Sequence, residues 1–315
     1  MKVFVTGGAG FIGLNVVREL IKDGHEVTIF DLPGQVEKTE IPENVKVIIG
    51  SILDNVMLHR AIQGNEYIIH LAAKLGVKRT EVERLNCLNV NIKGTENILE
   101  SAVKENIKKV VFTSSSEVYG NQLETPITEE SPVNPISVYA ITKLVGEEYL
   151  KAYKQEYDLD YSIIRFFNVY GAGQVGQFVI QRFIEAVKRN KSPQIYGDGK
   201  QVRCFCHVND AARGLVKVLF CNNLNNGEVF NIGNDTEPIN LEDLAFKIIK
   251  IAKKDIEPEF VPYSSSDRNL EREVFNRIPS IEKIKNILDY KPDISLENGL
   301  KKSYINHLYT KDWKV

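Results

Sequence analysis

A tyrosine and a lysine four residues apart could together form a base. Tyr139 and Lys143 fall within a segment that predicts a helix over Val138 to Tyr157, so the two side chains share one helix face, one turn apart. A lysine ammonium beside a phenol favours the phenolate and lowers a pKa that is otherwise about 10. Such a base could take the proton of an alcohol whose carbon gives up a hydride. The spacing by itself is common and also fits an ordinary pair on a helix surface.

Hydroxyl groups and an acid follow a predicted strand over Val110 to Thr113. The strand runs into Ser114-Ser115-Ser116-Glu117, and open α/β folds bind ligands at the carboxyl ends of their strands. A hydroxyl of Ser115 or Ser116 could relay the proton that Tyr139 removes, and Glu117 could move a second one. The simpler alternatives are that the serines cap a turn and that Glu117 is a solvated loop acid.

Glycines at three-residue spacing predict a phosphate-binding turn at the start of the chain. The first predicted strand breaks into Gly7, Gly10 and Gly13 as it enters a helix. Glycines here permit a tight turn, close approach of the backbone to a pyrophosphate and close packing of the helix on the strand. The first helical residues, Phe11 and Ile12, would offer free N–H groups to the anion.

An acid at the end of the next predicted strand identifies the expected cofactor. Asp31 lies 18 residues after Gly13, close to the spacing at which a carboxylate accepts hydrogen bonds from the adenosine ribose. The same carboxylate would repel a 2′-phosphate, so the sequence predicts NAD rather than NADP. The positive nicotinamide ring would also favour the Tyr139 phenolate. The alternative is that Asp31 only begins the turn Asp31-Leu32-Pro33-Gly34, but the glycine turn favours the cofactor interpretation.

Strand-like and helix-like segments alternate through the first half of the chain, which predicts a Rossmann-type, doubly wound parallel α/β sheet. We expect residues 1–168 to form an NAD-binding domain. Residues 169–315 should be mainly a smaller C-terminal α/β substrate-binding region, which could return a strand or helix to the first domain. The expected strands are Val3–Thr6, Val27–Phe30, Val45–Ile49, Tyr67–Leu71, Val110–Thr113 and Tyr161–Arg165. The expected helices are Phe11–Lys22, Val56–Ile62, Cys87–Glu105, Val138–Tyr157, Gln177–Arg189, Asn209–Cys221, Leu241–Lys253 and Leu296–Leu308.

Composition excludes several classes of partner. The formal net charge is −2, with 40 Lys+Arg against 42 Asp+Glu, and the absence of a basic block argues against nucleic acid. The apolar runs are too short and interrupted to span a membrane, and we expect no leader. The four cysteines, Cys87, Cys204, Cys206 and Cys221, are too few and scattered for a disulfide framework, which predicts a cytoplasmic location. We expect no metal site, because no second pair or histidine cluster accompanies Cys204 and Cys206.

These motifs together resemble the extended short-chain dehydrogenase/reductase family, in particular its NAD-dependent nucleotide-sugar epimerases, dehydratases and decarboxylases. The likeness continues through the motifs Asn91–Thr95, Arg165–Gly171, Tyr196–Gly199, Arg203–Asp210 and Phe230–Gly233. It implies that Asn168 and Arg203 contact the diphosphate of a nucleotide sugar, and that Tyr196 belongs to the substrate region. It also implies further cofactor-binding residues, namely Ser51, Ile52, Leu71, Ala72 and Ala73. Ser51 replaces an acid that touches adenine in many relatives, so that contact would pass through the backbone.

Two residues favour one reaction among those of the resembling family, whose members first oxidise the sugar C4 hydroxyl. In the 4-epimerases the position of Glu117 carries no acid, whereas dehydratases and glucuronate decarboxylases have a glutamate there. Arg277-Ile-Pro-Ser-Ile281 resembles a decarboxylase segment whose arginine reaches the active site, and a guanidinium suits a substrate carboxylate. Alternatively, Arg277 pairs with Glu271 or Glu273.

UDP-glucuronate decarboxylation is therefore the best single expectation, with a 4,6-dehydratase or a 4-epimerase close behind. The substrate is expected to be a nucleotide sugar, with a UDP-sugar favoured. A regulator that keeps the fold without catalysis is a further alternative, but such proteins typically lose the tyrosine and lysine. The helices predicted over Cys87–Glu105 and Val138–Tyr157 pair in relatives, which implies a homodimer.

Overall fold

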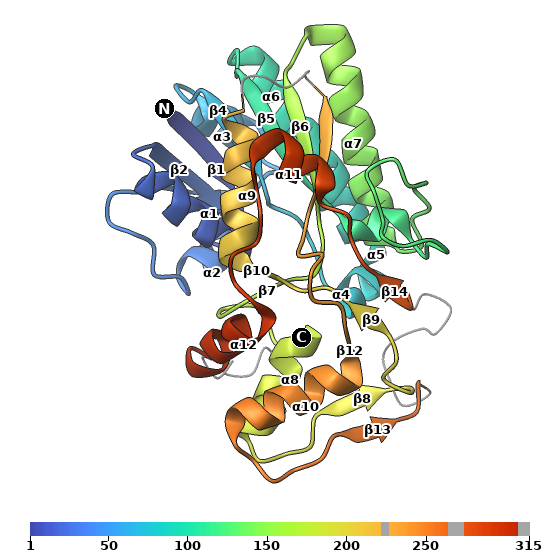
Figure 1. Cartoon of the computed structure of the whole chain (residues 1–315). Helices are drawn as coiled ribbons and strands as arrows, with labels where there is room; N and C mark the ends of the chain where they lie inside the picture. Colours follow the sequence, from blue (N-terminus) through green and yellow to red (C-terminus); the bar gives the residue numbers. More distant parts are fainter. Residues whose placement is uncertain (222–226, 264–273, 308–315) are drawn as a thin grey trace.

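The computed structural model describes residues 1–221, 227–263 and 274–307. Figure 1 shows an upper part, in which helices flank a central sheet, and a smaller lower part built from the second half of the chain. The two parts meet where the sheet strands end. This junction is where the expected functional residues converge.

The central sheet has seven parallel strands in the order β11-β6-β5-β4-β1-β2-β3. β1 lies between β2 and β4, so that Val5 is opposite Ile29 on one side and Ile69 on the other. The order reverses on passing β1, as in a doubly wound sheet, and the Rossmann-type fold is confirmed. The strands are β1 (Lys2–Thr6), β2 (Glu26–Asp31), β3 (Lys46–Ile49), β4 (Tyr67–His70), β5 (Lys109–Ser115), β6 (Tyr161–Phe166) and β11 (Glu228–Ile232).

Alternate residues along each strand face opposite layers of helices. Val3 and Val5 pack into a core with Val17 of α1, whereas Phe4 packs into a second core with Leu58 of α3. The first core takes in α1 (Phe11–Lys22), α9 (Val208–Leu219) and α11 (Glu282–Leu288). The second takes in α3 (Asn55–Ile62), α6 (Gly94–Lys104) and α7 (Val138–Tyr157). Both faces of the sheet are therefore covered, which explains the continuous apolar strand sequences.

Three elements from the second half of the chain return to the upper part. β11 pairs with β6 over Glu228–Ile232, while α9 and α11 contribute buried residues to the first core. Figure 1 shows α9 beside α1 and α11 crossing near β11. Residues after 168 thus complete the sheet as well as forming the lower part.

One predicted helix is divided. Instead of a single helix over Cys87–Glu105, the chain forms α5 (Arg84–Leu88), a π-helical turn η1 (Asn89–Lys93) and then α6. Such turns occur often at functional sites, and Asn91 lies within this one. Four short helices also went unpredicted, namely α2 (Pro33–Val36), α4 (Val77–Val82), the 3-10 helix η2 (Ser116–Tyr119) and α11.

The lower part is held by its own core between α8 (Val179–Lys188), α10 (Leu241–Ala252) and α12 (Leu296–Ile305). These confirm three predicted helices, although Leu308, where the last was expected to end, lies outside the described residues. Small sheets lie at the junction of the two parts and within the lower part (Figure 1). Their strands are β7 (Val169–Tyr170) with β10 (Cys206–His207), β8 (Gln194–Tyr196) with β13 (Glu259–Val261), and β9 (Val202–Arg203) between β12 (Ile239–Asn240) and β14 (Asn276–Arg277).

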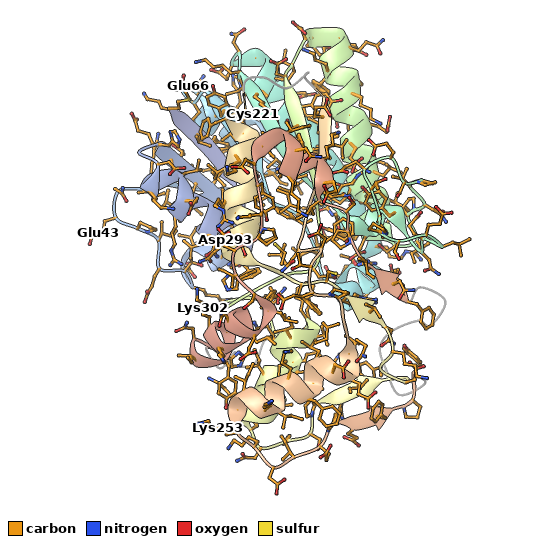
Figure 2. The ribbon with its side chains drawn as sticks, viewed as in Figure 1. Glu43, Glu66, Cys221, Lys253, Asp293 and Lys302 are labelled. Atoms are coloured by element: carbon orange, nitrogen blue, oxygen red, sulfur yellow. The ribbon has the colours of Figure 1, made fainter. Side chains whose placement is uncertain are left out.

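The exposed charges are of both signs on both parts of the molecule. Figure 2 shows Glu43 and Glu66 at the edge of the upper part, and Lys253 and Lys302 on the lower part. No helix in the described ranges is long and apolar enough to cross a membrane. Within the same residues, no group of three His, Cys, Asp or Glu side chains is placed to hold a metal ion.

A buried ion pair joins α7 to the sheet. Arg165 of β6 donates from Nε and Nη2 to the Glu147 carboxylate of α7, at 3.0 and 2.6 Å. Ser114 of β5 donates to the same carboxylate at 2.5 Å, and Glu147 has no exposed surface. Each charge therefore depends on its partner, because an unpaired buried charge is strongly destabilising.

Glu147→Ala should lower the free energy of unfolding by about 3–5 kcal/mol, since Arg165 would stay buried without its carboxylate. The matched control is Glu148→Ala on the same helix, whose exposed pair with Lys151 should contribute no more than about 1 kcal/mol. Denaturant unfolding of both variants checks this expectation. Equal losses for the two glutamates would contradict it.

Candidate active site

The glycine turn between β1 and α1 leaves no room for side chains. A Cβ on Gly13 would lie 2.1 Å from the Gly7 carbonyl oxygen, and one on Gly7, whose φ is +70°, would lie 2.7 Å from the Ala72 nitrogen. The Gly10 amide donates to the Gly7 carbonyl at 3.0 Å. Helix α1 then begins at Phe11 without a side-chain cap, so its first N–H groups are available to an anion.

Asp31 braces this turn from the end of β2. Its two carboxylate oxygens accept from the backbone N–H of Ala9, at 3.0 Å, and of Leu32, at 2.8 Å. Burial raises the pKa of Asp31, and these two hydrogen bonds oppose the rise. Asp31 thus begins a turn, as the simpler interpretation expected. It also lies beside the glycine turn, where the cofactor interpretation needs it.

The other expected cofactor residues follow β3 and β4. Ser51 Oγ accepts from the Leu53 amide at 3.2 Å, and the Ile52 carbonyl accepts from Asn97 Nδ2 at 2.9 Å. Leu71, Ala72 and Ala73 follow β4 and are half-buried. The Leu71 and Ala72 amides donate to the Thr6 carbonyl and hydroxyl oxygens, at 3.1 and 3.2 Å. Both segments therefore border the carboxyl edge of the sheet, near the glycine turn.

Tyr139 and Lys143 lie in the first turns of α7. Lys143 is 2% exposed, with Nζ 4.8 Å from the Phe112 ring centre and 5.7 Å from that of Tyr139. Within the described chain, no hydrogen bond is made by the Lys143 ammonium. Burial lowers the pKa of Lys143 to about 8. A buried ammonium with only aromatic contacts fits a ligand that supplies hydroxyl oxygens.

The pKa of Tyr139 moves opposite to the sequence-based expectation. Burial raises it above 10, and the negative charge of Glu117 raises it further. Lys143 Nζ lies 5.7 Å from the centre of the Tyr139 ring, but burial is the largest influence on this pKa. Burial and Glu117 both disfavour the phenolate, which a positive charge on a bound ligand would favour.

The serine loop after β5 is tied to the start of α7. Ser115 Oγ caps η2 by accepting from the Glu117 amide at 3.2 Å, which matches the capping alternative. Glu117 Oε2 accepts from Ser137 Oγ at 2.9 Å, and Ser137 caps α7 by accepting from the Ala140 amide at 3.1 Å. Ser116 is 2% exposed. Glu117 thus lies at the start of α7, close enough for its charge to act on Tyr139, and Ser115 is joined to it, whereas Ser116 is buried.

Asn91 is a functional candidate that residue-by-residue reasoning missed. From the π-helical turn, Oδ1 accepts from the Lys74 amide at 2.7 Å, and Nδ2 donates to the Lys74 carbonyl and to Thr142 Oγ1, both at 3.0 Å. Asn91 thereby fixes the loop after β4 against α7, next to Lys143. The motif Asn91–Thr95 was visible in the sequence, but only the fold shows what it holds.

The two arginines expected to bind the substrate diphosphate and the substrate carboxylate lie on adjacent strands of a small sheet. Arg203 of β9 and Arg277 of β14 are register partners on adjacent parallel strands. Arg203 Nη1 also donates to the Phe275 carbonyl at 3.0 Å. Asn168, with φ of 36°, donates to the Cys204 carbonyl at 3.0 Å. The suggested partners of Arg277, Glu271 and Glu273, lie outside the described residues.

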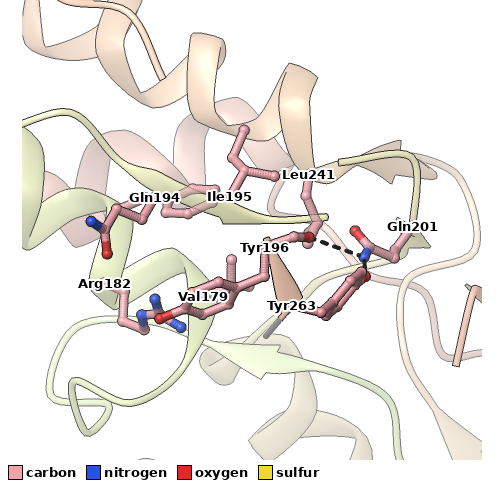
Figure 3. Close-up of a pocket in the computed structure, with 9 residues that line it drawn as sticks. Val179, Arg182, Gln194, Ile195, Tyr196, Gln201, Leu241 and Tyr263 are labelled. Carbon is pink, nitrogen blue, oxygen red and sulfur yellow. Dashed lines mark hydrogen bonds between the residues drawn. The ribbon is translucent and has the colours of Figure 1, made fainter. Parts of the chain in front are cut away.

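Tyr196 lines a narrow cavity in the lower part. Figure 3 shows Arg182 beside the Tyr196 ring, with the guanidinium carbon 4.6 Å from the ring centre, while Gln201 hydrogen-bonds to Tyr263. The cavity volume is about 20 Å³, enough for roughly one water molecule. Tyr196 is therefore in the expected region, but this cavity is too small for a sugar or a base.

The fold and this site define a class of nucleotide-binding oxidoreductase-like enzymes, with a glycine turn, a Tyr-Lys pair and a smaller second part beyond the ends of the sheet strands. The chain belongs to the NAD dependent epimerase/dehydratase family, whose model matches residues 3–233. The expected NAD dependence is thus confirmed.

Relatives in this family differ in their reactions. The chain is 35% identical to a UDP-N-acetyl-alpha-D-glucosaminuronate decarboxylase of Bacillus cytotoxicus, over 96% of each chain. It is 36% identical to a putative UDP-glucose 4-epimerase of Methanocaldococcus jannaschii, over 95% and 96%. The solved structure of UDP-glucuronic acid 4-epimerase from Bacillus cereus, in complex with UDP-glucuronic acid and NAD, has a TM-score of 0.88 at 30% identity, covering 97% of this chain and 98% of that one. These likenesses establish the family and not the individual reaction.

Gly13→Ala should weaken NAD binding by about tenfold or more, because the new methyl group would force the turn to open. The matched control is Gly34→Ala, where an added Cβ meets nothing within 4 Å. Calorimetric titration with NAD measures both variants, and circular dichroism checks that they are folded. Retention of full affinity by Gly13→Ala would remove the turn from the cofactor site.

Glu117→Gln should lower the pKa of Tyr139, because it removes a negative charge that disfavours the phenolate. In a plot of the rate of NAD reduction against pH, the rising limb, which reports deprotonation of Tyr139, should therefore move to lower pH, even if the maximal rate also changes. Single-turnover NAD reduction across a pH series measures the limb. Glu124→Gln, an exposed acid of the following loop, should leave the limb in place. An unmoved limb in Glu117→Gln would separate Glu117 from Tyr139.

Proposed function

We propose that this enzyme decarboxylates a UDP-linked hexuronate, with UDP-glucuronate as the best single substrate. The observation that carries the proposal is the pairing of Arg203 with Arg277 on adjacent strands, where the segment after Arg277 is hydrogen-bonded to Ile127, between Glu117 and α7 in the chain. One guanidinium suits the substrate diphosphate and the other suits a sugar carboxylate. The decarboxylase relative at 35% identity supports the same reaction class.

Tyr139 is proposed as the base that removes the C4 hydroxyl proton, with Ser115 relaying it. The glycine turn, Asp31 and Lys143 would hold NAD, which accepts the C4 hydride when bound and later returns it. Lys143 would orient the hydroxyls of the nicotinamide ribose through its ammonium, which is buried near the N-terminal end of α7. Since burial raises the pKa of Tyr139, the base works only when a nearby cation stabilises the phenolate.

Oxidation at C4 makes the sugar a β-keto acid, and the remaining steps follow from that. The bond between C5 and the carboxylate carbon breaks, its electron pair passes toward the C4 ketone, and CO₂ leaves. Arg277 would bind and orient the carboxylate before this step, and Glu117 would orient the sugar or relay to C5 a proton taken from solvent. Tyr139 returns its proton to the C4 oxygen as the hydride comes back, which yields a UDP-pentose.

A 4,6-dehydratase is the second candidate, because Glu117 beside Tyr139 could instead remove the C5 proton. A 4-epimerase needs no such acid, although epimerases are among the relatives. The retention of both Tyr139 and Lys143 on α7 favours catalysis over a purely regulatory role.

Assembly, location and domain division belong to the same proposal. We infer a homodimer in which the segments Cys87–Glu105 and Val138–Tyr157 face a second copy, supported by the exposure of Ile141 at 43%. A cytoplasmic location is supported by four free cysteines. We further propose that residues 1–168 bind NAD and that residues 169–315 mainly bind the substrate, apart from the elements that return to the sheet.

Arg277→Ala should lower kcat/KM for UDP-glucuronate by about 10- to 150-fold, the effect of losing hydrogen bonds to a charged group. C4 oxidation of uncharged UDP-glucose should change little. Arg277→Lys should fall between, because it keeps the charge without the planar fork. Tyr139→Phe should abolish turnover of every substrate.

Mass spectrometry of a panel of UDP-, GDP- and dTDP-sugars, including glucuronate and N-acetylglucosaminuronate forms, reads the outcome. Loss of CO₂ identifies a decarboxylase, loss of water a dehydratase and an isobaric product an epimerase. If Arg277→Ala affected acidic and neutral sugars alike, the preference for a carboxylate substrate would be wrong.

A further inference from the structure

The motif Phe230-Asn-Ile-Gly233 on β11 is not explained by catalysis. Asn231 has no exposed surface, so it cannot touch a substrate. Its Nδ2 donates to the Ile127 carbonyl at 3.1 Å and to the Ser280 carbonyl at 3.3 Å. The Tyr119 hydroxyl donates to its Oδ1 at 2.8 Å. Because backbone carbonyls can only accept hydrogen bonds, Nδ2 and not Oδ1 of the Asn231 side chain must face Ile127 and Ser280.

The two segments that Asn231 joins also bind each other. The Ile127 amide donates to the Ile278 carbonyl at 2.8 Å, and the Ser280 amide donates to the Ile127 carbonyl at 2.7 Å. Ile278 directly follows Arg277, so these bonds fix where the arginine leaves β14. Ile127 belongs to the chain between η2, which includes Glu117, and α7, which carries Tyr139.

Neighbouring contacts strengthen the same junction. A Cβ on Gly233 would lie 2.9 Å from Pro279 Cγ, so glycine lets the Arg277 segment pack directly on the end of β11. The backbone N–H of Asn231 donates to Glu129 Oε1 at 2.7 Å, and Arg165 Nη1 donates to the Glu129 backbone carbonyl at 3.3 Å. The junction is therefore joined to the buried pair of Arg165 with Glu147.

We propose that Asn231 is a positioning residue for substrate choice: its side-chain amide holds the segment that carries Arg277 in register with the catalytic loop. This inference rests on the proposed function, in which Arg277 binds the substrate carboxylate. Loss of the two donated hydrogen bonds would let residues 277–280 shift relative to Ile127. The guanidinium would then meet the carboxylate less well, while uncharged sugars would be bound as before.

The test compares binding of UDP-glucuronate and UDP-glucose to NAD-loaded enzyme in a Tyr139→Phe background, which prevents turnover. Asn231→Asp keeps the acceptor for Tyr119 and removes both donations. It should reduce the preference for UDP-glucuronate by about tenfold, within the range of couplings between residues of one network, and change the Kd for UDP-glucose by less than about threefold. Asn65→Asp is the matched control, since Asn65 Nδ2 also donates to two carbonyls but lies far along the chain from the site.

A double-mutant cycle with Arg277→Ala separates positioning from general damage. Asn231→Asp should have no further effect on the preference once Arg277 is gone. Equal weakening of both ligands, or an additive effect in the double variant, would overturn the positioning role. Should Asn231→Asp not fold, Asn231→Ser gives the same comparison. An unchanged preference in Arg277→Ala would instead overturn the proposed function itself, and the positioning role with it.

Discussion

The buried pair between Glu147 and Arg165 is the interaction on which the site depends most. Glu147 belongs to α7, which carries Tyr139 and Lys143, and Arg165 belongs to β6, which leads to Asn168. The Ser114 hydroxyl on the same carboxylate adds β5, whose end carries Ser115. One completely buried carboxylate therefore sets the relative positions of three elements that carry the proposed catalytic and substrate-binding groups. Separating the pair would leave a buried charge without its partner, which is strongly destabilising.

The ionisation states at the site follow from the same burial. Packing α7 against the sheet lowers the pKa of Lys143 and raises that of Tyr139, and each change disfavours the charged form. Opposite charges or hydrogen bonds from a bound ligand would favour the charged forms again. The negative charge of Glu117 adds to the effect of burial on Tyr139.

Much of the fold could be predicted because the sequence alternates between two periodicities. Six of the seven sheet strands and the long helices follow from apolar spacing, and the glycine turn follows from glycine's freedom at Gly7. β11 was not predicted, because Glu228–Ile232 is one short strand among turns whose partner, β6, is distant in sequence. The π-helical turn at Asn89–Lys93 was also missed, since a single extra residue in a helix hardly alters its periodicity.

The sequence by itself determined the class of protein: the glycine spacing, Asp31 and the Tyr-Lys pair are local patterns whose chemistry depends on short separations along the chain. Tertiary structure alone decided which distant residues act together. It brought Arg203 beside Arg277, joined Glu117 to the cap of α7 and made Asn231 the junction of three segments. It also reversed the expected direction of the Tyr139 pKa. The physical reason is that desolvation and long-range hydrogen bonds depend on what surrounds a group, and no spacing within a sequence specifies that.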